Sequence, residues 1–281
     1  MKTVWIVLCL LSVAGLCHAD RDIVYAARYY APPGSRRTSH FHIYRINPDG
    51  TGRTQLTFGS DDEYTPKWSS DGRLITFFVN DGVSWGKICE IGASGGRPRI
   101  VKRLTEAPSI PNPPVAFGYR LEDVDMENGV SERHILFNLK TGRRLTLLAD
   151  DDTFPTLLPA PGHGLIYADN RHTSTVGTNF AFYRLNPATG ALHYLTEGQF
   201  LAWSPDGARF CTAPGRDTTP FEKRREPLAV ETGASQEQRD EARYRTVWAA
   251  PLYVRAAGGG KMRQITPRLS WVTGADWRRG K

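Results

Sequence analysis

One pattern of residues returns along this chain and limits the folds that it can adopt. The clearest copies run from Trp68 to Gly72, reading Trp-Ser-Ser-Asp-Gly, and from Trp203 to Gly207, reading Trp-Ser-Pro-Asp-Gly. A Leu-Thr pair precedes each copy and an apolar run follows it. A pattern that returns about every 20–50 residues indicates repeated structural units rather than one irregular fold.

The Leu-Thr pair, or its Ile-Thr equivalent, gives the number of units. Successive pairs stand 48, 41, 50 and 70 residues apart. A short apolar segment and a Gly-containing turn come before each pair. The five pairs are Leu56-Thr57, Leu104-Thr105, Leu145-Thr146, Leu195-Thr196 and Ile265-Thr266.

Each unit predicts four short strands joined by tight turns. Asp-Gly between apolar runs is a hairpin signal, because Gly adopts the positive φ that such a turn needs. One four-stranded sheet cannot bury both of its faces, so the sheets must pack against one another around an axis. We therefore predict an all-β fold, a five-bladed β-propeller of four-stranded antiparallel blades. Six blades is the alternative, because the interval of 70 residues has room for a degenerate unit.

The two ends of the repeated region complement each other. The segment from Asp22 to Tyr30 matches the second strand of a unit, and residues 271–277 match a Trp-containing first strand. We expect the C-terminal strand to join the first blade, which would close the ring and remove a free edge.

Residues 214–246 are highly charged without β alternation. We interpret them as a charged loop insertion, with a mobile loop or a short polar helix inside it.

These units resemble the TolB-like, or WD40-like, β-propeller repeat. The consensus of that repeat is a polar turn, Leu-Thr, a spacer, Trp-Ser-Pro-Asp-Gly and an apolar strand. Residues 203–207 match the Trp-Ser-Pro-Asp-Gly core at every position, and residues 68–72 lack only the Pro. The resemblance covers residues 22 to 277 and is weakest at residues 113–125. TolB carries an α/β domain ahead of its propeller, which we do not expect here. Dipeptidyl-peptidase-like enzymes have a similar propeller but add a catalytic domain.

The first residues predict export. Lys2 precedes an apolar run from Val4 to Leu16, and Ala19 provides a small residue for cleavage. Such a run has the length of a signal peptide and is too short to span a bilayer. We expect a signal peptide at 1–19, a propeller at 20–281, and a periplasmic or secreted protein without a transmembrane segment. A lipoprotein anchored at Cys17 is the weaker alternative, because Leu16 is not small.

Charge and cysteine content exclude several classes of protein. The net charge of +7 is spread over loops, so we expect no nucleic-acid partner. Cys89 and Cys211 lie far apart in predicted strands, and we expect buried free thiols. Gly-x-Ser-x-Gly occurs at residues 82–86 and 92–96, but each copy falls in a predicted loop between two strands rather than between a strand and a helix. No phosphate loop opens a helix, so we predict neither a Ser hydrolase nor a cofactor.

The longer loops all fall on one face of the predicted propeller, and loops on a rigid scaffold commonly carry function. Rings that stack and guanidinium groups that bind carboxylates would suit a sugar or a peptide there. The predicted ligand-binding residues on this long-loop face are Arg28, Tyr29, Tyr30, Trp85, Asn170 and Arg171.

Metal binding is the alternative use of the same face. Residues 61–63 and 150–152 are acidic, but neither has the spacing of a calcium loop. His40 and His42 share one face of a strand and, with His172, would suit a transition metal. Oligogalacturonate lyases are similar in using a His-x-His pair on a metal, although the Gln that they also use is missing near His40.

Together these features predict a non-catalytic module. We expect an exported binding module or scaffold for a cell-envelope protein or glycan, with its ligand on the long-loop face and with no metal or cofactor. The alternative is a metal-assisted polysaccharide lyase of the oligogalacturonate type. Propellers place unrelated functions on one scaffold, so the repeat by itself does not name the ligand.

Overall fold

The regular structure is almost wholly strand. The structure, a computed structural model, describes residues 22–29, 40–80, 86–105, 115–116, 118–124, 133–147, 154–170, 180–213, 222–227, 244–268 and 270–279. One 3-10 turn, η1 (Pro161–His163), is the single helical element in these ranges. None of the described segments forms a helix long and apolar enough to cross a membrane. The predicted all-β class is confirmed.

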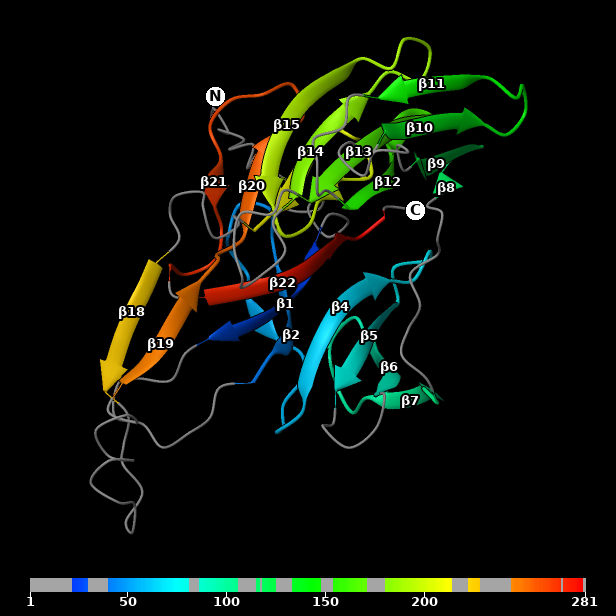
Figure 1. The fold of residues 1–281 in the computed structure, drawn as a ribbon. Coiled ribbons are helices and arrows are strands. Elements are labelled where there is room, and N and C mark those ends of the chain that lie inside the picture. Colours follow the sequence, from blue (N-terminus) through cyan, green and yellow to red (C-terminus); the bar gives the residue numbers. More distant parts are fainter. Residues whose placement is uncertain are drawn as a thin grey trace, which may run out of the picture.

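Twenty of the strands form five four-stranded antiparallel sheets (Figure 1). In the first sheet the order is β22 (Ser270–Trp277), β1 (Ile23–Tyr29), β2 (His42–Ile46) and β3 (Thr54–Gln55). The second contains β4 (Asp62–Trp68), β5 (Leu74–Asn80), β6 (Lys87–Gly92) and β7 (Arg99–Arg103). The third contains β8 (Val115–Ala116), β9 (Tyr119–Val124), β10 (Arg133–Asn138) and β11 (Arg144–Leu147).

The fourth and fifth sheets complete this set. The fourth contains β12 (Phe154–Ala160), β13 (Gly164–Asn170), β14 (Phe180–Leu185) and β15 (Leu192–Gly198). The fifth contains β16 (Ala202–Trp203), β17 (Arg209–Thr212), β20 (Tyr253–Ala256) and β21 (Arg263–Gln264). Each sheet follows the chain from one strand to the next, apart from β22 in the first sheet and the excursion between β17 and β20 in the fifth.

The last strand joins the first, as the sequence predicts. β22 pairs antiparallel with β1 from Ile23–Trp277 to Tyr29–Ser270. The Trp277 side chain is only 2% exposed. Its indole Nε1 donates a hydrogen bond of 3.0 Å to the carbonyl oxygen of Ala202 in β16. The closing strand of the first sheet is thereby attached to the fifth sheet.

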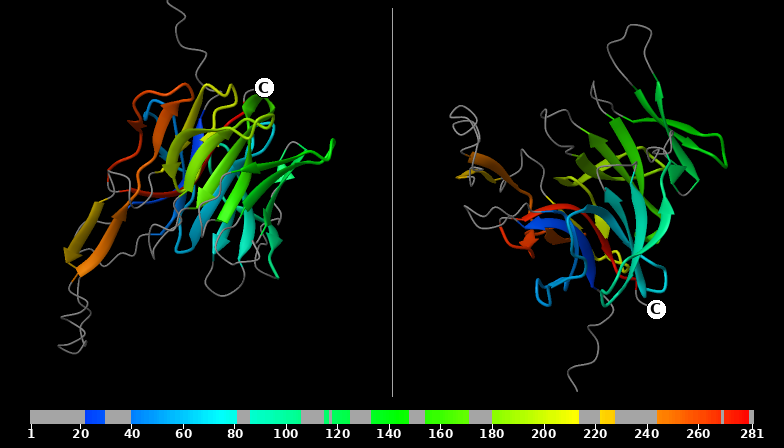
Figure 2. Two further views of the ribbon diagram at one scale, coloured as in Figure 1. Left: turned by 45° about the horizontal axis from the view of Figure 1, so that its top comes forward. Right: turned by 90° about the horizontal axis from the view of Figure 1, so that it is seen from below.

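β22 also contacts the second sheet. The backbone N–H of Trp68 in β4 donates to the Asp276 carboxylate at 2.8 Å. The Arg278 guanidinium lies 5.2 Å from the centroid of the Trp68 ring. Figures 1 and 2 show β22 and β1 together across the middle of the molecule, between the second sheet and the fourth and fifth sheets.

The hydrophobic core lies between the sheets rather than within one of them. Separate clusters of buried side chains join the first sheet to the fifth, the first to the second, and the third to the fourth. A fourth cluster brings Trp203 of the fifth sheet against the fourth. Among the described residues, no cluster joins the second sheet to the third.

The repeated Ser-x-Asp-Gly turn is a small hydrogen-bonded unit. The Ser204 hydroxyl donates to the Asp206 carboxylate at 2.6 Å and accepts the N–H of Arg209 at 2.9 Å. Gly207 has φ +67°, a conformation that Gly adopts without strain. The turn that begins at Ser69 repeats these bonds, with the N–H of Leu74 as donor to the hydroxyl.

The repeated Leu-Thr pair has its own hydrogen bond. The Thr57 hydroxyl accepts the N–H of Ile43 at 2.9 Å, and the Thr266 hydroxyl accepts the N–H of Leu252 at 2.8 Å. A Thr at this position therefore satisfies a buried donor of the neighbouring strand. Two of the five threonines are exposed and do not share this buried position: Thr105 and Thr146.

The charged insertion holds strands that the sequence analysis did not expect. β18 (Glu222–Pro227) and β19 (Tyr244–Ala249) form a separate two-stranded antiparallel sheet. A segment without apolar alternation becomes a strand here because antiparallel pairing uses backbone groups, which do not depend on the side chains. The expectation of an insertion without strands is therefore wrong for residues 222–227.

Both described cysteines are buried free thiols, as the sequence predicts. Burial raises the pKa of the Cys211 thiol to about 12 and also raises the pKa of Cys89. A thiol in such surroundings is a packing group rather than a reactive nucleophile.

We expect Trp277→Ala to destabilise the protein by about 3–5 kcal/mol, the usual cost of truncating a buried Trp. The lost ring packs between the first and fifth sheets, so both sheets lose support. The free energy of unfolding in urea measures the effect. Lys261→Ala, an exposed change in the turn after β20, is the control, and an equal cost for the two variants would contradict the prediction.

We also expect Asp276 to make stability depend on pH. Burial raises the pKa of its carboxyl above the usual 3.8, so the folded protein keeps this proton at a pH where the unfolded chain releases it. The free energy of unfolding therefore falls as pH rises from 3.8 through the raised pKa of the folded state. Asp276→Asn keeps an acceptor for the Trp68 N–H and does not titrate.

The measurement for Asp276 is the free energy of unfolding of both proteins over about pH 3.5–7. The stability of Asp276→Asn relative to the unmodified protein should increase as pH rises. Parallel profiles for the two proteins would show that burial of Asp276 has no such consequence.

Candidate functional site

The structure describes only part of the predicted ligand-binding set. Arg28 and Tyr29 end β1, and Asn170 ends β13, where its backbone pairs with Phe154 and Phe180. The other three lie outside the described residues: Tyr30, Trp85 and Arg171. The full set therefore stays a prediction, and its described part lies at the end of β1.

Arg28 lies at the junction of the first two sheets. Its guanidinium is 3.4 Å from the Asp62 carboxylate of β4 and 4.4 Å from the centroid of the Phe41 ring. The two charged side chains are 26% and 27% exposed, so solvent still reaches the pair. Arg28 Nε has no hydrogen-bond partner among the described residues. That nitrogen is itself buried, so Arg28 is a cation that is held in place and only partly exposed.

Tyr29 points to the opposite face of β1, as neighbours on a strand do. Its hydroxyl is 2.8 Å from that of Tyr25, and the Arg53 guanidinium lies 4.9 Å from its ring centroid. Burial raises the pKa of the Tyr29 hydroxyl. The structure therefore does not bring the side chains of Arg28 and Tyr29 together.

Aromatic side chains surround Arg28 instead. Trp271 of β22 is its direct cross-strand neighbour, and the ring centroids of Trp271 and Phe41 are 5.6 Å apart. The Phe41 and Tyr64 rings are 5.2 Å apart. Burial, and then the nearby Asp62 carboxylate, raise the pKa of Tyr64. We name this group the rim cluster: Arg28, His40, Phe41, Asp62, Tyr64 and Trp271.

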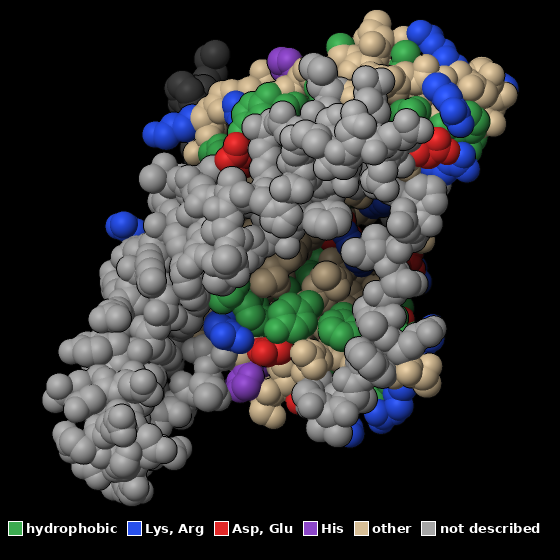
Figure 3. Space-filling view, viewed as in Figure 1, with side chains coloured by type: hydrophobic (Ala, Val, Ile, Leu, Met, Phe, Trp, Pro, Cys, Tyr) green, Lys and Arg blue, Asp and Glu red, His purple; other side chains and the backbone are tan. Residues whose placement is uncertain are grey.

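Figure 3 shows the exposed part of this region. Hydrophobic side chains lie beside acidic, basic and His side chains in the hollowed middle of the face, over β1, β2 and β4. The sequence analysis missed Phe41, Tyr64 and Trp271 because they come from three segments that meet only when β22 closes the first sheet. An aromatic residue near the end of each segment is the signal that could have found them.

The acidic run 61–63 does not converge on one point. Asp61 pairs with Lys87 at 3.1 Å, whereas Asp62 faces Arg28. Glu63 is buried and accepts hydrogen bonds from the Thr57 hydroxyl and from a backbone N–H. Each carboxylate has a separate partner, so this run offers no shared cation site.

The two histidines of the metal alternative also face carboxylates. His40 Nδ1 lies 3.5 Å from Asp62 and His42 Nδ1 lies 3.7 Å from Glu63, and the two ring centroids are 6.4 Å apart. His172 lies outside the described residues. Within the described ranges, no group of His, Cys, Asp and Glu side chains could hold a metal ion.

A second feature lies between the fourth and fifth sheets, at their tight turns. Two hollows of about 200 and 330 Å³ share the Arg184 side chain, and we name them together the Arg184 groove. The first hollow includes the turn after β20, and the second lies between η1 and the turn after β16. The groove is separate from the rim cluster and shares no residue with it.

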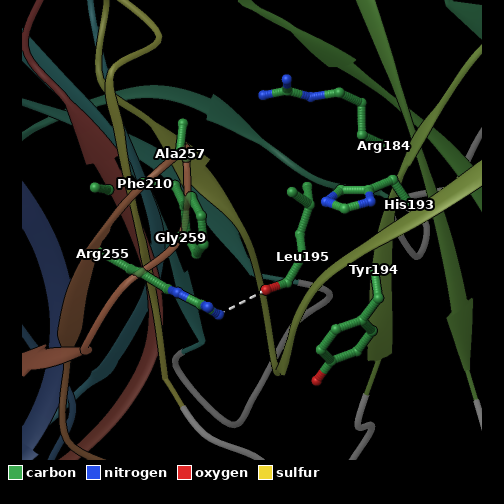
Figure 4. A pocket seen from close by; sticks show the side chains of 10 residues that line it. Arg184, His193, Tyr194, Leu195, Phe210, Arg255, Ala257 and Gly259 are labelled. Carbon is green, nitrogen blue, oxygen red and sulfur yellow. Dashed lines mark hydrogen bonds between the residues drawn. The ribbon is translucent and has the colours of Figure 1, made fainter.

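Figure 4 shows how the groove is built. Arg184 and His193, a cross-strand pair of β14 and β15, lie on one side, and Phe210 and Arg255, a pair of β17 and β20, lie on the other. Arg255 Nη1 donates to the carbonyl oxygen of Leu195 at 2.8 Å. The hydrogen bond fixes one cation of the groove to the neighbouring sheet.

Comparison with known proteins gives only local or distant likenesses. No protein-family model matches the chain. A segment of 74 residues is 32% identical to dipeptidyl-peptidase 5 of Porphyromonas gingivalis. That segment is 26% of this chain and spans 10% of the length of the peptidase, so the activity of that enzyme is not carried over.

The solved structures that match this chain are distant from it in sequence and in structure. TolB of Acinetobacter baumannii matches with a TM-score of 0.41 and 14% sequence identity. The match covers 92% of this chain and 67% of the TolB chain. An oligogalacturonate lyase in complex with manganese has a TM-score of 0.32 and 12% identity, covering 86% of this chain and 78% of its own. Likeness at this level assigns the chain to no family.

Proposed function

We propose that this chain is an exported five-bladed β-propeller that acts as a non-catalytic binding module for a cell-envelope protein or glycan. The ligand contacts the long-loop face, through the rim cluster and the predicted ligand-binding residues. The signal peptide at 1–19, a periplasmic or secreted location and the residue range 20–281 for the propeller belong to the same proposal.

The five four-stranded sheets support the blade count. One sheet corresponds to each Leu-Thr unit, and the extra residues of the longest interval include the separate β18–β19 sheet rather than a sixth blade. Inter-sheet cores link the sheets in the order second, first, fifth, fourth, third. A closed ring requires one further contact, between the second and third sheets.

The observation that carries the binding role is the Arg28 guanidinium. It is held between Phe41 and Asp62 and remains partly exposed, although its Nε is buried without a hydrogen-bond partner among the described residues. A positioned guanidinium beside aromatic rings suits carboxylates, sugars and peptides. The site has the composition of a recognition surface, in which Arg and aromatic residues are enriched.

Affinity capture from cell-envelope extracts tests this role. We expect the unmodified protein to retain a protein or glycan, and Arg28→Ala to lower its retention at least about tenfold, a loss of roughly 1.4 kcal/mol. Arg73→Ala is the matched control, because Arg73 is an exposed, ion-paired arginine in a tight turn. Thermal unfolding of each variant should first show that it is folded.

Equal capture by Arg28→Ala and the unmodified protein would exclude the rim cluster as the ligand site. Capture of no envelope component by the unmodified protein would contradict the binding role itself.

The metal-assisted lyase remains the second candidate, because His40 and His42 stand two residues apart with their ring centroids 6.4 Å from each other. Quantifying transition metal in the purified protein separates the two functions. We expect less than stoichiometric metal, unchanged in His40→Ala. A stoichiometric metal that is lost in His40→Ala would favour the lyase and contradict the non-catalytic proposal.

A further inference from the structure

The first and fourth sheets are copies of one unit, and their registers align residue by residue. β1 contains Val24, which pairs with Arg45 of β2, and β13 contains Ile166, which pairs with Arg184 of β14. Both Val24 and Ile166 are fully buried. Arg45 and Arg184 therefore occupy the same position of the repeat.

In the first sheet this arginine is satisfied by the protein itself. Arg45 Nε lies 3.4 Å from the Asp22 carboxylate, and Arg45 Nη1 donates to the carbonyl oxygen of Ala93 at 3.0 Å. Asp22 stands two residues before Val24. The arginine, its counter-charge and the neighbouring sheet form one closed arrangement.

In the fourth sheet no aspartate stands at the position that corresponds to Asp22. The residue two positions before Ile166 is Gly164, and both Gly164 and Arg184 line the hollow of about 330 Å³. Arg184 is exposed, and it has no ion pair within the described part of the chain. The hollow thus borders the position that corresponds to Asp22.

The wall that faces Arg184 adds a second cation. In the second sheet Trp68, Ile75 and Ile91 are cross-strand neighbours on three successive strands. They pack against Val24, the cross-strand partner of Arg45, and Ile91 is only 2% exposed. The corresponding row of the fifth sheet is Trp203–Phe210–Arg255. An arginine therefore replaces an apolar residue that seals the equivalent junction, and its Nε has no hydrogen-bond partner among the described residues.

One carboxylate also lines the groove. Asp206 accepts hydrogen bonds from the Ser204 hydroxyl and from the N–H of Ala208, at 2.6 and 3.1 Å. It belongs to its own turn and makes no ion pair with Arg184. The positive side chains of the groove, by contrast, come from both sheets.

We propose that the Arg184 groove binds the carboxylate group of a small organic acid, which takes the place that Asp22 has beside Arg45. The Arg184 fork binds the carboxylate in the hollow that Gly164 and Trp203 line. Arg255 and Phe210 line the adjoining hollow of about 200 Å³, from which Arg255 adds positive charge. Two-pronged arginine contacts to carboxylates are among the stronger hydrogen-bonded pairs. A volume of about 330 Å³ is within the usual range for small-molecule sites.

Direct titration tests this proposal. The probes are acetate, N-acetylglycine for a peptide carboxylate, and D-glucuronate for an acidic sugar, with D-glucose as the neutral match. We expect saturable shifts of the amide signals of Gly164, Gly207 and Gly259, which line the groove. D-glucose should shift none of these signals. Tighter binding of N-acetylglycine would identify a peptide carboxylate as the ligand group, and tighter binding of D-glucuronate would identify an acidic sugar.

Two variants of Gly164 provide the sharpest comparison. Gly164 has φ −72° and ψ 160°, so any residue can adopt its conformation. A Cβ there would lie 3.3 Å from Ala160 Cβ, a crowding that Gly164→Asp and Gly164→Ala share. Gly164→Asp adds a carboxylate of the protein itself beside Arg184 and should lower the affinity for the probes at least tenfold. The affinity of Gly164→Ala should stay within threefold of that of the unmodified protein.

Arg184→Ala should also lose at least tenfold in affinity, and Arg28→Ala should lose nothing, because the rim cluster is separate. Failure of the envelope-binding role would leave these results unchanged. Equal binding by Gly164→Asp and Gly164→Ala would overturn the proposal. So would unchanged binding by Arg184→Ala, the absence of saturable shifts with every carboxylate probe, or shifts with inorganic phosphate alone.

Discussion

The pairing of β22 with β1 is the contact on which the rest of the molecule depends. Through this pairing β22 becomes the end strand of the first sheet, next to β1. Its Trp277 indole reaches the fifth sheet and its Asp276 carboxylate reaches the second. Without that strand, β1 would be an edge with a row of unpaired backbone groups. Both the core between the first and fifth sheets and the rim cluster contain residues of β22.

The repeated motifs satisfy polar backbone groups that this closure buries. Ser204 and Thr266 lie in different parts of the unit, yet each hydroxyl accepts a backbone N–H of a neighbouring strand or turn. Small hydroxyl side chains can do this without adding volume between packed sheets. The repeat is therefore best understood as a set of hydrogen-bond acceptors in fixed positions, with apolar strands between them.

Local patterns were enough to predict the strands, the turns and the partner of β22. Apolar runs and Asp-Gly turns specify hairpins without reference to distant residues. Patterns of this kind failed for β18, whose charged sequence has no alternation, and for the contacts between Arg28, Asp62 and Trp271, which come from three strands. The position of Arg184 relative to Gly164 required the register of two sheets, which no short motif contains.

The place of β22 also affects how the protein reaches its folded state. Residues 270–277 pair with a strand that begins at residue 23, so the first sheet cannot be completed until residues 270–277 have been synthesised. Pairings with such sequence separation form slowly. Before those residues are available, the unpaired edge of β1 needs protection from aggregation.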